Sequence, residues 1–292
     1  MPEAAVHDDP VATFEAERPR LRALAYRMLG TLGDAEDAVQ DTYVRWHRSD
    51  RNAVRTPQAW LVSACTRICI DRLRRARTER AAYIGPWLPE PMIVEAQDSP
   101  TLDDSLSLAF LVVLERLSPA ERAAWLLHQA FEYDYPEIAR ALDKSEPACR
   151  QLVSRARRHL KEARPRFAPD RAQADAIAAR FVRAAATGDR TALMELLAPG
   201  AELWSDGGGK ALAALNVITG ADRVARFMVG VTRKQPASMR RVFARINGMP
   251  GLIAWQGRTP YFTLSLDIVD GQVAGVYIVR NPDKLMHLPA VT

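Results

Sequence analysis

The chain has 292 residues, of which 48% are hydrophobic and 26% are charged, a composition typical of a globular protein with about two domains. It has no apolar run near the roughly 20 residues that a membrane-spanning helix needs. Residues 1–20 are acidic and lack the apolar core of a secretion signal, so we expect a cytoplasmic protein without a membrane segment. Three cysteines, Cys65, Cys69 and Cys149, are too few and too scattered for a disulfide framework or a four-cysteine zinc site.

The distribution of charge is more informative than the net charge of +5. Residues 60–80 hold six arginines against two acidic side chains, a net charge of +4. Residues 81–146 hold four basic and twelve acidic side chains, or −8, and residues 147–168 hold seven basic side chains and one acidic side chain, or +6. Two basic segments around an acidic one indicate two separate nucleic-acid contacts joined by a segment that stays away from phosphates.

Residues 14–49 have the spacing of two helices. Gly30 is expected to end the first helix, and Gly33 with Asp34 is expected to start the second. The second helix is acidic on its outer side, which either faces solvent or docks on a basic partner. That outer side carries Glu36, Asp37, Gln40, Asp41, Val44 and Arg45.

A third helix is predicted to open at Thr56 and Pro57 and to become rich in arginine toward its end. Six arginines over fourteen positions are more than solubility requires, and arginine is favoured where phosphates and base edges are contacted. A solvated helix face is the alternative to nucleic-acid contact. For Cys65 and Cys69 on this helix, burial in helix packing is favoured over a redox pair.

Residues 83–105 contain four prolines and a run of acidic side chains. Proline disfavours helix and extends the chain, so the sequence predicts a linker of some stiffness. Trp87 and Leu88 between prolines are unusual in a solvated tether and predict insertion into a groove elsewhere on the chain. A plain tether remains the alternative.

Helices are predicted over residues 106–116 and from a capping box of Ser118 and Glu121. Residues 134–161 then read as two helices around a tight turn. Asp134 and Glu137 form a second capping box, and Ser145 caps the last helix. That helix combines an apolar stripe with a face rich in Arg, Gln and Ser, which suits the major groove of DNA. A solvated surface helix is the alternative.

The last 120 residues or so change in character. Helices are predicted over residues 174–186 and 190–197, and Asn247-Gly248 and Asp270-Gly271 are hairpin signals. Helices followed by several antiparallel strands predict a compact α+β domain. The expected strands cover residues 201–205, 239–246, 252–256, 261–268 and 273–279.

Residues 34–48, DAEDAVQDTYVRWHR, and 56–75, TPQAWLVSACTRICIDRLRR, resemble region 2 of the extracytoplasmic-function sigma factors of the sigma-70 family. Residues 117–160 resemble their region 4. The resemblance implies a dissociable subunit of bacterial RNA polymerase that recognises promoters. It implies domains at residues 10–82 (region 2), 83–105 (linker) and 106–167 (region 4), with a C-terminal domain at residues 170–292.

The resemblance assigns roles by position in the motifs. It implies that core polymerase is a partner through its β′ clamp helices and its β subunit. The residues of region 2 implied to contact the clamp helices are Asp37, Gln40, Asp41 and Val44. It implies recognition and opening of the −10 element by Trp60, Arg67, Arg72, Arg74 and Arg75. It implies recognition of the −35 element in duplex DNA by Ser145, Arg150, Gln151, Ser154, Arg155 and Arg158.

Three short motifs extend the resemblance to sigma factors with a fused SnoaL-like domain, the SigJ-type group, whose fold is a cone of curved sheet around helices. WLPEP spans residues 87–91, DGGGK spans 206–210 and NPDKL spans 281–285. The extension implies control of the factor in cis. The regulatory residues so implied are Trp87, Leu88, Pro89, Glu90, Pro91, Asp206, Gly207, Gly208, Gly209, Lys210, Asn281, Pro282, Asp283, Lys284 and Leu285.

The motifs predict that the DGGGK loop and the NPDKL end hold the WLPEP linker, with Asp206 and Lys210 fixing the loop by charge-assisted hydrogen bonds. No catalytic residue, metal or cofactor is expected, and the free protein is expected to be a monomer that binds core polymerase and promoter DNA. A small-molecule sensor is a further interpretation of the cone. The aromatic residues expected at its mouth are Trp204, Phe227, Trp255, Tyr261 and Phe262.

A different interpretation of the whole chain is a ligand-responsive helix-turn-helix regulator with a small-molecule-binding C-terminal domain. Such a regulator needs one DNA-reading helix pair. It needs neither a helix that binds core polymerase nor a second arginine-rich reader. The presence of region 2 therefore favours the sigma factor.

Overall fold

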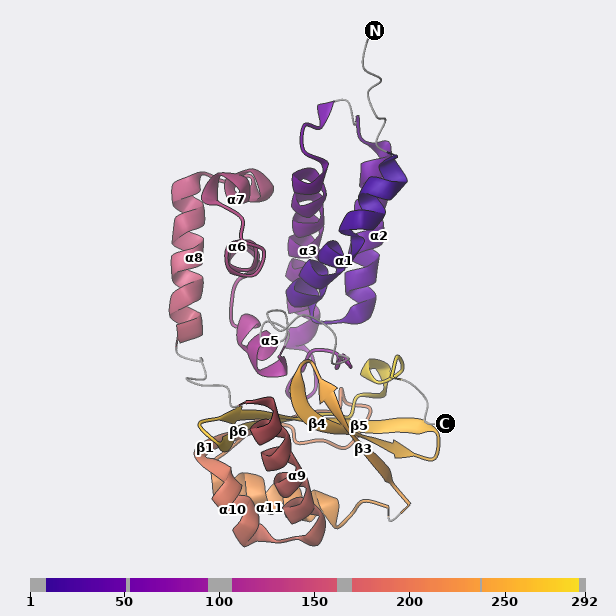
Figure 1. Cartoon of the computed structure of the whole chain (residues 1–292), viewed down its shortest axis with the longest axis vertical. Coiled ribbons are helices and arrows are strands. Elements are labelled where there is room, and N and C mark those ends of the chain that lie inside the picture. Colours follow the sequence, from indigo (N-terminus) through magenta and orange to yellow (C-terminus); the bar gives the residue numbers. More distant parts are fainter. Residues whose placement is uncertain (1–8, 51–52, 94–106, 162–169, 237, 289–292) are drawn as a thin grey trace. The chain divides into compact units, whose positions relative to one another are not determined.

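The computed structural model describes residues 9–50, 53–93, 107–161, 170–236 and 238–288 (Figure 1). The chain divides into two compact units. The first unit combines Met1–Glu79 with Leu114–Glu162, and the second combines Arg80–Val113 with Ala163–Thr292. Residues 80–93, which precede region 4 in the sequence, and residues 107–113 thus belong to the same unit as the C-terminal domain.

The N-terminal part of the first unit consists of helices α1 (Pro10–Leu29), α2 (Leu32–Arg48) and most of α3 (Pro57–Ala81). Gly30 ends α1 in the left-handed conformation (φ 81°), as predicted. The predicted start of α2 at Gly33 and Asp34 is wrong, because the hydroxyl of Thr31 accepts a hydrogen bond from the Asp34 amide and caps the helix earlier. Cys65 and Cys69 are buried in helix packing, as favoured from the sequence.

Three helices complete the first unit: α6 (Pro119–Gln129), α7 (Tyr135–Leu142) and α8 (Glu146–Lys161). Both predicted capping boxes are present, Ser118 with Glu121 and Asp134 with Glu137. Asp143 ends α7 with φ 52°, in the left-handed region that glycine usually occupies. One side of α8 is buried through Cys149, Val153, Ala156 and Leu160.

The second unit begins with the last two residues of α3 and the segment 82–93 that follows them. It also contains most of helix α5 (Leu108–Leu114). A helix was predicted over residues 106–116. The predicted start, residue 106, lies outside the described residues, and the observed helix ends at Leu114, two residues before the predicted end. The hydroxyl of Ser107 accepts from the amide of Phe110 at 3.1 Å and so caps the first turn.

The C-terminal domain packs helices against one face of a mixed sheet with the strand order β2-β1-β6-β5-β4-β3 (Figure 1). The helices are α9 (Arg171–Thr187), α10 (Arg190–Leu196) and α11 (Ala221–Thr232). The strands are β1 (Leu197–Asp206), β2 (Ile218–Thr219), β3 (Arg240–Ile246), β4 (Met249–Gln256), β5 (Thr259–Val269) and β6 (Gln272–Val279). A short 3-10 helix, Pro282–Lys284, follows the sheet.

This α+β domain confirms the expected fold class, with one correction. The strands were expected to be antiparallel, but β1 pairs with β6 in parallel. The sequence also predicted neither β2 nor α11. The two hairpin signals are confirmed: Asn247 and Gly248 have φ of 52° and 74°, and Asp270 and Gly271 have φ of 51° and 77°.

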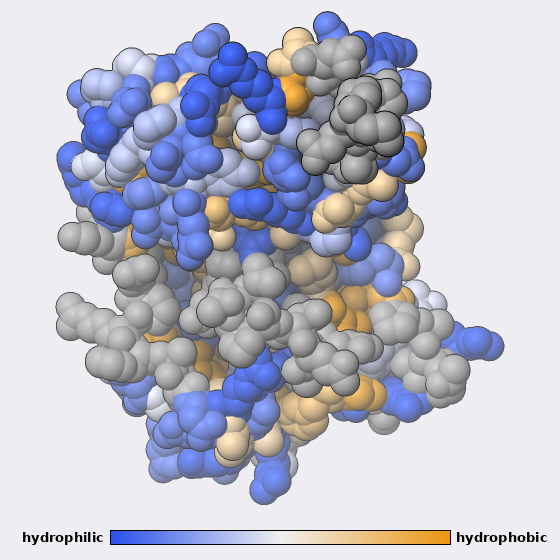
Figure 2. Space-filling view, turned by 45° about the horizontal axis from the view of Figure 1, so that its top comes forward, coloured by the Kyte–Doolittle hydropathy of each residue, from blue (hydrophilic) through white to orange (hydrophobic). Residues whose placement is uncertain are grey.

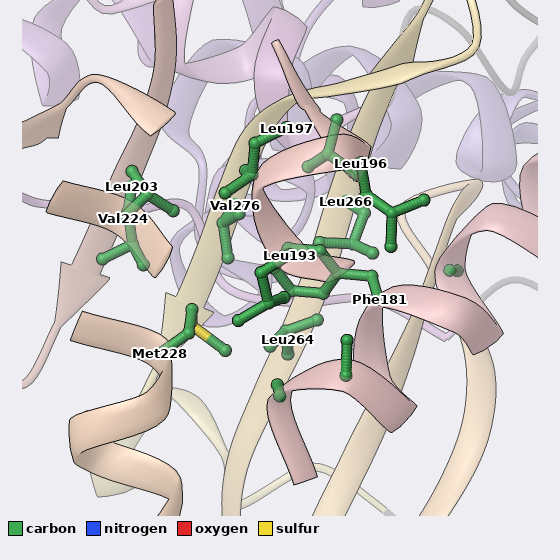
Figure 3. Close-up of a cluster of buried hydrophobic side chains, with 14 of the residues drawn as sticks. Phe181, Leu193, Leu196, Leu197, Leu203, Val224, Met228, Leu264, Leu266 and Val276 are labelled. Carbon is green, nitrogen blue, oxygen red and sulfur yellow. The ribbon is translucent and has the colours of Figure 1, made fainter. Parts of the chain in front are cut away.

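The alternation of side chains along the strands divides the buried residues between the two faces of the sheet. Leu264 and Leu266 of β5 meet Phe181 of α9 and Met228 of α11 in the main core (Figure 3). A second apolar cluster includes Leu108 and Val112 of α5 and Leu88 of the linker. From the sheet and the chain end it takes Ile246, Met249, Ile253, Trp255, Tyr277, Val279, Leu285 and Leu288, and Trp204 packs against it.

None of the described helices is long and apolar enough to cross a membrane. In the view of Figure 2, hydrophilic side chains cover most of the described surface, and hydrophobic residues occupy smaller areas.

Candidate functional site

Within the second unit, the segment 83–93 runs along the C-terminal domain. The side chain of Leu88 is completely buried (0% exposed) in the second apolar cluster, and Pro89 and Pro91 are also buried. Further along, Met92 and Asn247 exchange two hydrogen bonds at the β3–β4 hairpin: the Met92 amide donates to Asn247 Oδ1 at 2.9 Å, and the Asn247 amide donates to the Met92 carbonyl at 2.7 Å. The described part of the linker is therefore fixed to the domain by backbone and side-chain contacts.

Asp206, the last residue of β1 and the first of DGGGK, lies at the centre of these contacts. Its carboxylate is completely buried (0% exposed) and accepts three hydrogen bonds. Oδ1 accepts from the hydroxyl of Tyr83 at 2.6 Å, and Oδ2 accepts from the Leu88 amide at 2.9 Å and from Lys284 Nζ at 2.7 Å. Burial and this carboxylate raise the pKa of Tyr83.

Lys284 brings the NPDKL motif to the same point. Its side chain is 8% exposed, and its Nζ donates to the carbonyl of Leu88 at 2.5 Å as well as to Asp206. Burial lowers the pKa of Lys284, and the Asp206 carboxylate opposes that effect. Both backbone polar groups of Leu88 are thus bonded to a single buried ion pair, which we call the lock.

The indole of Trp87 contacts two cations. The guanidinium carbon of Arg80 lies 3.6 Å from the ring centroid, and Lys284 Nζ lies 4.2 Å from it. Cation–π attraction is strongest for tryptophan and grows with desolvation. The WLPEP motif therefore supplies an aromatic face for the lock in addition to the buried Leu88.

The glycines of DGGGK allow other chain segments to approach closely. Gly208 has φ 58°, and a Cβ there would lie 2.3 Å from Asn281 Nδ2 and 2.9 Å from the hydroxyl of Tyr83. Gly209 has φ 70°, and a Cβ there would lie 2.9 Å from Ile84 Cδ1. A side chain at either position would push apart the three segments that meet here.

Asp206 and Lys210 both make charge-assisted hydrogen bonds, as expected, and each does so with a residue of NPDKL and not with the other. Asp206 binds Lys284, while Lys210 Nζ binds Asp283 Oδ2 at 2.5 Å with both side chains more than half exposed. The physical reason is the turn at Gly207, where the Lys210 amide donates to the Gly207 carbonyl and the lysine points to solvent, away from the buried carboxylate.

Sequence reasoning missed Tyr83, Asn247 and His287. His287 Nδ1 lies 2.7 Å from Glu90 Oε1, and its Nε2 lies 2.6 Å from the carbonyl oxygen of Pro91. Burial alone would lower the pKa of His287, but the contacts with Glu90 and Pro91 outweigh burial and raise it. The sequence did offer a signal for His287, because it is the one histidine of residues 170–292 and lies two positions after NPDKL.

The residues expected to contact core polymerase lie on the outer face of α2. Asp37, Gln40, Asp41 and Val44 are all exposed. Arg72 of α3, expected at the −10 element, also reaches this face: its Nη2 donates to Asp41 Oδ2 at 2.7 Å, and its Nη1 lies 3.5 Å from Asp37 Oδ2. Arg72 and two of these acidic residues therefore form one ion-pair network.

The other −10 candidates are spread along α3. Arg75 is exposed, Arg74 is exposed and pairs with Asp71 at 3.0 Å, and the half-buried ring of Trp60 lies 5.3 Å from that of Trp46. Arg67 hydrogen-bonds within the first unit to two carbonyls near the end of α7. Its Nε donates to Ala141 at 2.9 Å and its Nη2 to Arg140 at 2.7 Å.

The −35 candidates share the outer face of α8, and every one of them is exposed. Ser145 caps the helix by accepting from the Ala148 amide at 3.4 Å. Arg150 pairs with Glu146 at 3.2 Å and lies over the ring of Tyr135, while Arg155 donates to Gln151 at 3.4 Å. The remaining candidates on this face are Ser154 and Arg158. A rigid helix thus presents a basic, hydrogen-bonding surface opposite its packed side.

Comparison with known families defines the class of protein. Residues 13–79 match the model "Sigma-70 region 2", and residues 107–160 match "Sigma-70, region 4". The first match covers the helices that carry the core-polymerase and −10 candidates, and the second covers the helix that carries the −35 candidates.

Relatives that match nearly the whole chain narrow this class. The chain is 35% identical to the ECF RNA polymerase sigma factor SigJ of Mycobacterium tuberculosis, over 96% of this chain and 94% of the relative. It is 33% identical to the probable ECF sigma factor SigI of the same species, over 97% of each. The crystal structure of M. tuberculosis SigJ aligns with a TM-score of 0.76 at 32% identity, over 94% of this chain and 97% of that one. The chain therefore belongs to the extracytoplasmic-function sigma factors.

Membership in this family confirms the predicted function, promoter-specific initiation of transcription as a subunit of RNA polymerase. The sigma regions and the C-terminal domain occur together, as the three short motifs predicted. The match to region 2 favours this function over the ligand-responsive regulator, which needs no such region.

Proposed function

We propose that the C-terminal domain controls this sigma factor in cis by holding the linker between regions 2 and 4. The observation that carries the proposal is the lock: the Asp206–Lys284 pair binds both the amide and the carbonyl of Leu88, whose side chain is fully buried. Residues of WLPEP, DGGGK and NPDKL thereby meet at one point.

The physics of a buried ion pair makes the lock sensitive to its partners. A charge in the interior is costly unless a partner and hydrogen bonds compensate it. In the lock, Leu88 supplies two of these hydrogen bonds. If Leu88 left its buried position, the Asp206 carboxylate and the Lys284 ammonium would each lose one hydrogen bond. The linker is therefore held firmly, and a partner that replaces its contacts would release it.

Run-off transcription with purified core polymerase tests the proposal. Lys284→Met keeps most of the side-chain bulk and removes the cation, while Lys210→Met removes the exposed pair with Asp283 as a matched control. We expect Lys284→Met to change transcript yield at least fivefold and Lys210→Met to leave it within twofold. Circular dichroism checks that both variants remain folded. Equal yields from folded Lys284→Met and wild-type protein would contradict control through the lock.

For promoter recognition, we propose that α8 contacts the −35 element in the major groove, that α3 contacts the −10 element, and that the outer face of α2 binds the β′ clamp helices. The exposed polar and basic side chains on the outer face of α8 support its assignment to the −35 element. Gln151→Ala should relax base preference in the −35 element, whereas Arg158→Ala should weaken binding evenly across promoter sequences. Transcription from a library of −35 variants distinguishes the two, and an unchanged preference for Gln151→Ala would argue against base contact.

We further propose that the C-terminal domain is regulatory and not catalytic, in a protein that works as a free monomer joining cytoplasmic polymerase. General acid–base catalysis most often uses His, Glu or Asp. Among the described residues that line the cavity of the cone there is no Asp, Glu or His, and the titratable side chains include Lys234 and Tyr261. Burial raises the pKa of Asp267 to about 6. Side chains alternate between the two faces along β5, so Asp267 points to the other face of the sheet from Phe262 and Leu264, which line the cavity.

A further inference from the structure

The C-terminal domain encloses a cavity of about 190 Å³ between α9, α11 and the helix-facing side of the sheet. Its wall is mainly apolar, with Phe181 from α9, Phe227 and Met228 from α11, and Phe262 and Leu264 from β5. Tyr261, Phe227 and Phe262 line it as expected from the sequence. Trp204 and Trp255 do not line it, because strand alternation turns them toward the cluster that holds Leu88.

Three basic side chains lie among the residues that line this cavity: Lys234 after α11, Arg241 of β3 and Arg280 after β6. Arg241 is held by a hydrogen bond to Gln235, which also lines the cavity, at 2.6 Å. No carboxylate stands among the described lining residues. Three positive charges around an apolar cavity favour an anion over a cation or a neutral molecule.

Arg280 has hydrogen-bonding capacity to spare. Its Nη1 donates to the carbonyl of Leu212 at 2.6 Å, its guanidinium lies 4.6 Å from the ring of Tyr261, and its Nε is buried without an acceptor among the described residues. A planar guanidinium is suited to bind a carboxylate or a similar group through two bonds. Leu212, beside it, is 81% exposed and would be covered by an apolar ligand.

We propose that this cavity binds an organic anion with an apolar body. The acidic group lies among Arg280, Arg241 and Lys234, and the apolar part lies against Phe181, Met228 and the strand residues. This division matches the general construction of ligand sites, in which apolar walls bury the ligand and a few polar groups orient it. The cavity lies on the other face of the sheet from Leu88, and it adjoins the lock at the end of β1, where the Arg280 amide donates to the Asp206 carbonyl at 2.7 Å.

Calorimetric titration of the full-length protein without polymerase tests the site with three probes that share one apolar body: 4-phenylbutyrate, 4-phenylbutanol and 4-phenylbutylammonium. We expect the anion to bind at least tenfold more tightly than the alcohol or the ammonium compound. Arg280→Met should weaken anion binding at least tenfold. The double variant Lys234→Met/Arg241→Met changes exposed side chains only, and it should weaken anion binding severalfold.

Arg223→Met, an exposed arginine of α11 outside the cavity, serves as the control and should bind the anion as wild type does. Equal affinity for the three probes, no detectable binding of the anion, or unchanged binding by both the double variant and folded Arg280→Met would each overturn the proposal. Because polymerase is absent, these results do not depend on whether the lock controls transcription.

Discussion

At the scale of single residues, Asp206 and Lys284 depend on each other more than any exposed pair does. Removing one partner of a buried ion pair typically costs about 3–5 kcal/mol, because the other charge stays buried without compensation. We expect Lys284→Met and Asp206→Leu each to lower the free energy of unfolding by about this amount. The double variant should lose clearly less than the sum. Urea unfolding of all four proteins gives the double-mutant cycle.

The exposed pair of Lys210 with Asp283 provides the comparison for that cycle. Exposed ion pairs contribute about 1 kcal/mol or less, so Lys210→Met should scarcely change the urea midpoint. If Lys284→Met were as mild as Lys210→Met, the buried pair could not be what holds the linker.

We expect His287 to make the attachment of the linker dependent on pH. Its pKa is raised in the folded protein, so its stabilising effect is fully present below the unfolded value of about 6.5 and is lost as the pH rises through the folded-state value. His287→Gln should therefore destabilise the protein at pH 5.5 and much less at pH 8.5. Thermal unfolding across that range measures the difference, and Glu90→Gln should reproduce it. A pH-independent difference would show that the charge on His287 is not involved.

At the scale of elements, the DGGGK loop depends on its glycines. Gly208→Ala adds a Cβ in a left-handed conformation and within 2.3 Å of Asn281 Nδ2, so both strain and a clash oppose it. We expect a loss of about 1–3 kcal/mol and easier proteolysis of residues 80–93. Gly200→Ala is the matched control, because nothing lies within 4 Å of its Cβ. Similar melting temperatures for the two variants would contradict close packing of the DGGGK loop against Tyr83 and Asn281.

Local signals in the sequence predicted the elements that local chemistry specifies. The capping boxes at Ser118 and Asp134, and the hairpins at Asn247 and Asp270, were predictable because the responsible residues are neighbours in the chain. Helix α11 was not predicted, since Gly220 at its N-cap makes no side-chain cap and gives no start signal. The parallel pairing of β1 with β6 depends on distant segments, which the antiparallel expectation did not consider.

The candidate site was predictable to a similar extent. The three motifs identified which segments meet, but not which atoms. Asp206 was expected to make charge-assisted hydrogen bonds, but its partner Lys284, seventy-eight residues away, was not predicted. Sheet register and the 3-10 turn at Pro282–Lys284 bring that lysine to the carboxylate, and no local pattern encodes such a distance.

At the scale of the whole molecule, the linker is joined to the C-terminal domain at two places. Residues 83–93 are fixed by the lock and its neighbours, and α5 adds Leu108 and Val112 to the same apolar cluster as Leu88. The second unit therefore contains the chain that connects the two sequence halves of the first. We therefore expect a change in the lock to act on the connection between region 2 and region 4.

This arrangement holds part of the linker on the C-terminal domain, so release of the lock would lengthen the free linker between regions 2 and 4. Residues 82–93, which follow α3, are twelve residues, and at roughly 3.5 Å per residue a released segment could take any span up to about 42 Å. One base pair of B-DNA rises about 3.4 Å, so this range is wide compared with a change of a few base pairs between two promoter elements. An intact lock should then make the factor strict about that spacing.

Promoters whose −35 and −10 elements are moved apart or together by one to four base pairs would reveal such strictness. With wild-type protein we expect yield to fall steeply on either side of one spacing, and with Lys284→Met we expect a broader profile. Arg223→Met should follow wild type. Equally narrow profiles for all three would mean that linker length does not set the spacing. A broader profile for Lys284→Met alone would make the buried pair the feature that sets the promoter spacing accepted by the factor.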